Sequence, residues 1–252
     1  MKKKDWPHLE NAPIVEALID IRVSLQPGFE ANTFRELYEM LKDVYPILEE
    51  IHAFGFKGEL NISESILNQE IADQIIGFRL KNAEGTRLVQ FRLDGFTFNH
   101  LQPYSDWDTF YNEAWRYWEL YLKIAEPTGV TRIALRYINK AELPLGEKLA
   151  TYVERPPALD KAISAELTAF LFHAQVKLTG SEDTVATVVQ YTEPTTPEHG
   201  IVYVLDIDAS KTGNFIPTEA ESFKNYFDEL RGFKNEIFFN TVTDKAIDLW
   251  KS

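Results

Sequence analysis

The stretch IVEALIDIRVS at residues 14–24 decides the fold. Its odd-numbered positions are all apolar, whereas its even-numbered positions include Glu16, Asp20 and Arg22. Successive side chains of a strand point to opposite faces, so this alternation predicts a strand with one apolar and one charged face. We expect such a strand in an antiparallel sheet that is covered on one side only.

Further elements follow from turn signals and from apolar spacing. Strands are expected at about 75–82, 86–93, 95–101, 130–142, 166–178, 184–192 and 201–208. Helical spacing predicts helices over about 30–45, 106–125 and 217–238, and a short one that ends near Trp250. Residues 47–73 are ambiguous, and we interpret them as one strand around Ala53–Phe56 followed by a polar connection.

Two halves of the chain share one order of elements: a strand, a connection, several antiparallel strands and a long helix. The fold class is therefore α+β, with mainly antiparallel sheets and helices packed on one side. Two tandem similar halves, 1–127 and 128–252, are one interpretation of this order. A single domain built from intimately packed halves is the other.

The composition of the chain argues against several kinds of site and segment. The 252 residues include no Cys, which excludes disulfides and cysteine metal sites. The basic start, Met1–Lys4, is not followed by an apolar run of the signal-peptide type, and no window approaches 18 uncharged apolar residues. We therefore expect a cytoplasmic protein without a membrane segment.

The net charge of −13 disfavours nucleic acid as a partner, because phosphate binding depends on Lys and Arg. Cations nevertheless gather in the expected strands, where they alternate with aromatic residues. A curved duplicated sheet with such a face has the shape of a minor-groove saddle, so nucleic-acid binding stays open as a second alternative.

Four segments resemble known sequence motifs. They are Leu9–Ala17 (LENAPIVEA), Arg132–Lys140 (RIALRYINK), Leu205–Asp208 (LDID) and Phe238–Asp244 (FFNTVTD). In this order they are similar to the opening, central and later motifs of a sporadically distributed bacterial family of uncharacterised proteins. The resemblance covers essentially the whole chain, but it implies no activity because none is assigned to that family.

The charged face of residues 14–24 is the first candidate site. Glu16, Asp20 and Arg22, joined by Arg132 and Arg136 from the second half, would form an anion-binding cleft, since guanidinium groups bind carboxylates bidentately. The alternative is that these charges neutralise one another in a structural ion-pair network, which would fix strand register.

Metal and cofactor signatures are weak. Asp206 and Asp208 would point the same way on a strand and are weak candidates for a divalent cation. No two histidines have metal-ligand spacing, and the phosphate-binding and serine-nucleophile motifs do not occur. We expect neither a metal nor a cofactor.

The missing catalytic motifs favour a non-enzymatic binding or regulatory protein, whose partner is a protein or an anionic small molecule. The alternative is an uncommon enzyme that acts on an anionic small molecule through the arginine and carboxylate cluster. Convergence of the cluster in an open pocket would favour the enzyme, whereas mutual pairing of its charges would favour the binding protein. The oligomeric state stays open.

Overall fold

The computed structural model describes residues 6–61, 66–160, 162–164, 167–193 and 200–251. Nine strands within these residues form one antiparallel sheet in the order β2-β3-β4-β5-β1-β6-β9-β8-β7. The strands are β1 (Ile14–Ser24), β2 (Ile47–Asn61), β3 (Ile66–Lys81), β4 (Arg87–Arg92), β5 (Gly95–Leu101), β6 (Gly129–Glu142), β7 (Leu171–Lys177), β8 (Thr184–Glu193) and β9 (Val202–Phe215).

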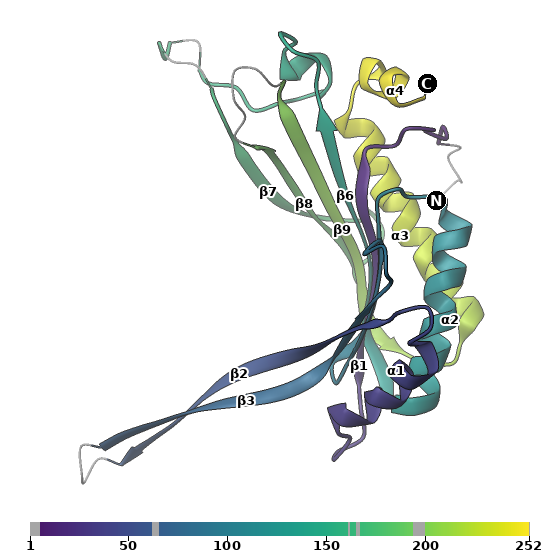
Figure 1. Cartoon of the computed structure of the whole chain (residues 1–252). Helices are drawn as coiled ribbons and strands as arrows, with labels where there is room; N and C mark the ends of the chain where they lie inside the picture. The colour runs from purple at the N-terminus through teal and green to yellow at the C-terminus, as the bar shows by residue number, and fades with distance from the viewer. Residues whose placement is uncertain (1–5, 62–65, 161, 165–166, 194–199, 252) are drawn as a thin grey trace.

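The helices gather on one side of this bent sheet (Figure 1). They are α1 (Arg35–Leu41), α2 (Trp107–Ala125), α3 (Ala220–Thr241) and α4 (Asp244–Lys251), with short 3-10 turns η1 (Ala31–Phe34) and η2 (Leu149–Thr151). The expected α+β class, with an antiparallel sheet and helices packed on one side, is confirmed. No helix in the described part of the chain is both long and apolar enough to cross a bilayer.

Strand β1 has the bounds that its alternation predicts and lies at the centre of the sheet, between β5 and β6. Ala17, Ile19 and Ile21 are at most 2% exposed and belong to the core beneath the helices. The charged residues of β1 occupy the opposite face, which the helices leave open (Figure 1).

Aromatic packing joins the sheet to α2 and α3. Asp106 caps α2 by accepting a hydrogen bond from the Thr109 amide at 2.9 Å. Trp118 of α2 lies between Phe96 of β5 and Phe223 of α3, at ring-centroid distances of 5.9 and 6.2 Å. The helix predicted over about 106–125 is therefore present, and its buried aromatic residues belong to the core.

The interpretation of residues 47–73 is wrong. Instead of one short strand and a polar connection, β2 and β3 form a long hairpin whose register runs from Ile47↔Lys81 to Asn61↔Ile66. Much of this hairpin projects away from the helices (Figure 1). Alternation marks a strand by its burial on one face, and the sequence of residues 47–73 shows no clear alternation.

Sheet connectivity follows one scheme on both sides of the β1–β6 pair. Strand β1 pairs with β5, the last strand before α2, and β6 pairs with β9, the last strand before α3. All these strands form one continuous sheet. The division at residues 127 and 128, and the relation of the halves as repeats, stay predictions.

Candidate functional site

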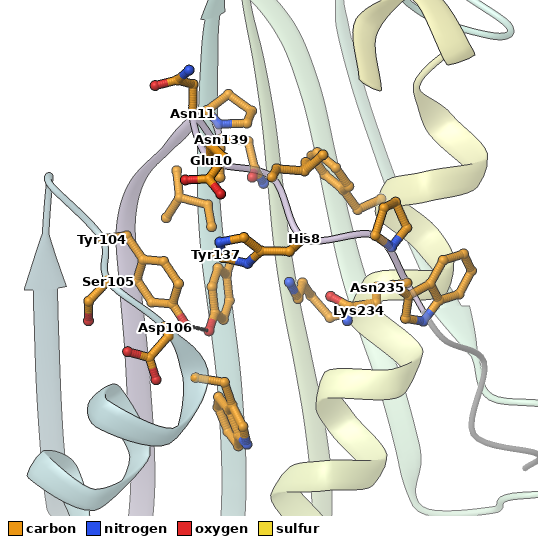
Figure 2. A pocket seen from close by; sticks show the side chains of 18 of the residues that line it. His8, Glu10, Asn11, Tyr104, Ser105, Asp106, Tyr137, Asn139, Lys234 and Asn235 are labelled. Carbon is orange, nitrogen blue, oxygen red and sulfur yellow. Dashed lines mark hydrogen bonds between the residues drawn. The ribbon is translucent and has the colours of Figure 1, made fainter. Parts of the chain in front are cut away.

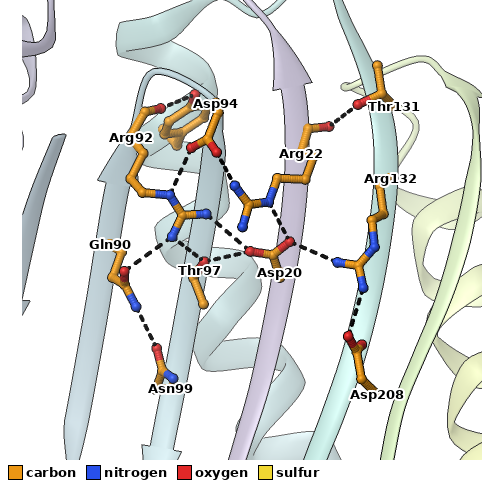
Figure 3. Close-up of polar contacts among 11 residues, drawn as sticks. Asp20, Arg22, Gln90, Arg92, Asp94, Thr97, Asn99, Thr131, Arg132 and Asp208 are labelled. Carbon is orange, nitrogen blue, oxygen red and sulfur yellow. Dashed lines mark hydrogen bonds and ion pairs between the residues drawn. The ribbon is translucent and has the colours of Figure 1, made fainter. Parts of the chain in front are cut away.

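Asp20 is the centre of the charged cluster on the open face of the sheet (Figure 3). Its side chain is only 9% exposed. Oδ1 accepts hydrogen bonds from Arg22 Nε at 2.9 Å and from Arg132 Nη1 at 3.2 Å. Oδ2 accepts from Arg92 Nη2 at 3.1 Å and from the Thr97 hydroxyl at 2.8 Å. One carboxylate thus holds three arginines from three strands.

The outer members of the cluster are also paired. Asp208 accepts from Arg132 Nη2 at 2.9 Å, and Asp206 accepts from Arg136 Nε at 2.8 Å. Hydrogen bonding to Asp206 raises the pKa of Arg136. Burial raises the pKa of Asp208, although the neighbouring arginines oppose that shift. The strand β9 therefore supplies a carboxylate to each arginine of β6 in the cluster.

Two further carboxylates complete the open face. Asp94, in the β4–β5 turn, pairs with both Arg22 and Arg92. Glu16 lies farther along β1 and accepts a hydrogen bond from the Asn99 amide at 2.6 Å. Sequence reasoning placed the β1 and β6 residues on one face, and it missed Asp94, because a residue in the turn between two strands has no place in the alternation of either strand.

The cluster has the features of an ion-pair network. Its arginines Arg22, Arg92, Arg132 and Arg136 each contact a carboxylate, so none is left to hold an anionic substrate. Burying charges costs several kcal/mol per ion, and mutual pairing offsets that cost with little surplus. The geometry therefore favours a role in holding β1, β4, β5, β6 and β9 in register.

Asp206 and Asp208 point the same way on β9, as predicted, but each carboxylate contacts an arginine. Within the described residues, no group of three or more metal-binding side chains gathers anywhere. The absence of a metal and of a cofactor stays a prediction.

A cavity of about 420 Å³ lies on the other side of the sheet (Figure 2). Its walls come from residues 6–14, from the β5–α2 connection and the start of α2 (residues 102–108), from β6 and from the second half of α3. Cavities of about 300–1,000 Å³ are the size that small molecules occupy in proteins.

Residues 6–14 are fixed across this cavity at both ends. The Asn11 amide donates to the Trp250 carbonyl at 2.9 Å, and Pro13 accepts from the Lys140 amide at 2.7 Å. At the other end, Trp6 stacks on Phe239 with ring centroids 4.9 Å apart. The segment therefore forms a wall of defined position.

Lys234 of α3 is the exceptional residue of the cavity. Its side chain points from the helix toward Tyr137, and its amine lies 3.9 Å from the centre of that ring (Figure 2). The residue is 9% exposed, and among the described residues no carboxylate or hydrogen-bond acceptor contacts its amine. Burial, together with the charge of Arg231, lowers the pKa of Lys234 to about 7.

The energetics leave this amine uncompensated. A desolvated cation–π contact contributes about 2 kcal/mol, whereas burial of an unpaired ion costs several kcal/mol. Strongly perturbed ionisable groups in a cavity are typical of functional sites. Lys234 therefore makes this cavity the stronger candidate for a site.

Three more cavity residues have polar groups that face inward. The hydroxyls of Tyr104 and Tyr137 hydrogen-bond at 2.8 Å, and His8 reaches toward them from the N-terminal segment (Figure 2). Burial raises the pKa of Tyr104 to about 12, so its hydroxyl stays protonated.

Sequence reasoning missed the cavity, although one signal could have found it. Lys234 interrupts the apolar stripe of α3, four residues after Leu230 and four before Phe238, both of which are buried. A lysine at a core position of an amphipathic helix is rarely fully buried without a partner.

Comparison with protein-family models, with curated proteins and with solved structures finds no match. The resemblance to the bacterial family therefore stays a prediction, and the function is argued from the site.

Proposed function

We propose that the protein is a non-enzymatic binding protein whose ligand is a small molecule held in the cavity between residues 6–14, the β5–α2 connection and α3. One observation carries the proposal. The amine of Lys234, a residue that is only 9% exposed, faces this cavity without a carboxylate partner among the described residues. A ligand supplies the compensation that the protein lacks.

The alternatives from the sequence have less support. An enzyme that uses the arginine and carboxylate cluster needs a free guanidinium for its substrate, but Asp20 already holds Arg22, Arg92 and Arg132. Nucleic-acid binding needs cations for the phosphates, and Arg79, Arg87 and the arginines of the cluster are paired with carboxylates. A cytoplasmic location and a regulatory role stay predictions.

A small-molecule screen by NMR tests the proposal. Compounds that bind at millimolar concentration should shift the signals of Tyr104, Tyr137 and Lys234. The substitution Asn235→Trp fills the cavity from α3 and should abolish binding. Asn240→Trp, at an exposed position of the same helix outside the cavity, should not.

Two results would contradict the proposal. One is a library in which no compound binds. The other is binding that shifts signals on the open sheet face and survives Asn235→Trp.

A further inference from the structure

We infer that the ligand of this cavity is a small aromatic acid, whose anionic group lies between Lys234 and Arg231 and whose ring lies against the aromatic walls. This inference rests on the proposed function and adds the chemical class of the ligand to it.

The charges of the cavity are the first reason. Arg231 and Lys234 are one turn apart on α3 and both line the cavity. Arg231 contacts the Trp107 ring at 5.4 Å, and no ion pair of either cation occurs among the described residues. Two unneutralised cations side by side repel each other, and an anion between them relieves that repulsion.

The acidic side chains nearby do not supply this anion. Both oxygens of Asp106 bind Thr109 at the start of α2, at 2.9 Å to its amide and 2.7 Å to its hydroxyl. Asp108 and Glu10 are exposed. In a chain of net charge −13, this pair of cations without a carboxylate is a specific feature and not a consequence of composition.

The walls of the cavity supply the second reason. The Trp6 and Phe239 rings are parallel within 5° at one side, and Trp107, Tyr104 and Phe238 also line the cavity. Flat apolar groups pack well against such rings. The tyrosine hydroxyls and the Asn235 amide are placed to bind the polar edge of a ligand.

Binding of an acid should be coupled to protonation. The ionisable groups that line the cavity with Lys234 are Arg231 on its own helix, Tyr137 of β6, Tyr104 and Asp106 of the β5–α2 connection, Asp108 of α2, and His8 with Glu10 on the N-terminal segment. Since the pKa of Lys234 is lowered to about 7, the amine is mostly neutral at pH 8.5. An anion favours the ammonium form, so binding at that pH takes up about one proton.

Isothermal titration calorimetry with matched probes tests the inference. Benzoate and phenyl phosphate are the acids, benzamide is the neutral analogue and benzylamine is the cation. The acids should bind, and the amide and the amine should bind at least tenfold more weakly. Affinity for the acids should fall about tenfold per pH unit between pH 7.5 and 9.5.

Four variants identify the residues on which the binding of the acids and its pH dependence rest. Lys234→Met should weaken benzoate binding at least tenfold and remove the pH dependence, whereas His8→Gln should retain that dependence. Arg231→Gln changes an exposed side chain, so the fold should persist, and it should also weaken binding. Lys224→Met removes an equal charge from α3 outside the cavity and should change affinity less than twofold.

Each contrary outcome has a distinct meaning. If benzamide binds as tightly as benzoate and Asn235→Trp abolishes both, the ligand is not an acid, but the binding function holds. If Lys224→Met weakens binding as much as Lys234→Met, general charge attraction explains it and the inference fails. If no probe binds and the wider screen yields no ligand, the proposed function fails as well.

Discussion

The open face of the sheet and the cavity beside α3 differ in how their charged side chains are paired. On the open face, Asp20 contacts three arginines, and each of those arginines contacts a carboxylate. In the cavity, Lys234 and Arg231 face no carboxylate among the described residues. Charged side chains that pair with one another hold the strands in register, whereas charged side chains without a partner indicate a binding site for a ligand. Substitutions in the two regions should therefore act on stability with opposite sign.

Asp20→Asn should have the largest effect. It keeps the shape of the side chain but leaves Arg22, Arg92 and Arg132 around a neutral group, and loss of one partner of a buried ion pair costs about 3–5 kcal/mol. Urea unfolding measures the loss. Asp94→Asn is the matched control, because Asp94 pairs with two of the same arginines but is 54% exposed, so its loss should be about 1 kcal/mol or less. Equal losses would show that Asp20 is not the centre of the network.

Lys234→Met should stabilise the ligand-free protein by about 1–4 kcal/mol at pH 6, since an apolar side chain replaces a buried unpaired cation. The pKa of Lys234 is lowered in the folded state, so the unfolded chain binds more protons between pH 7 and the ordinary lysine range. The destabilisation of the folded state by charged Lys234 is fully present below pH 7 and decreases as the pH rises toward about 10.4. Thermal melts across this pH range should show that the stabilisation by Lys234→Met decreases as the pH rises.

The matched substitution Lys224→Met should change stability by about 1 kcal/mol or less at every pH, because Lys224 is partly exposed in a surface ion pair. A Lys234→Met variant that is less stable than the wild type would mean that the cation–π contact with Tyr137 holds the fold, and the contrast between the regions would be lost.

Arg136→Ala should have a smaller effect than Asp20→Asn, a loss of about 1–2 kcal/mol, because the Arg136 side chain that hydrogen-bonds Asp206 is 39% exposed. Melts with and without benzoate should show the same shift. A benzoate effect that disappears only in this variant would move the site to the open face.

Sequence patterns predict most of what the core dictates. The bounds of β1, the strand at 95–101 and the aromatic stripe of α2 follow from burial on one face. The β2–β3 hairpin does not follow from such a pattern, because pairing between two backbones requires no particular side chains. The cavity combines Tyr137 of β6, Tyr104 and Lys234, residues up to 130 positions apart, and no local period brings such residues together.

The central position of β1 has a consequence for synthesis. Its partners are β5, which ends at Leu101, and β6, which begins only at Gly129. A nascent chain that has emerged as far as α2 can pair one edge of β1 but exposes the other, with Asp20 still lacking Arg132. Open strand edges are sites of pairing between unfinished chains. An edge of the growing sheet therefore stays open to misassembly until β6, and after it β9, has been made.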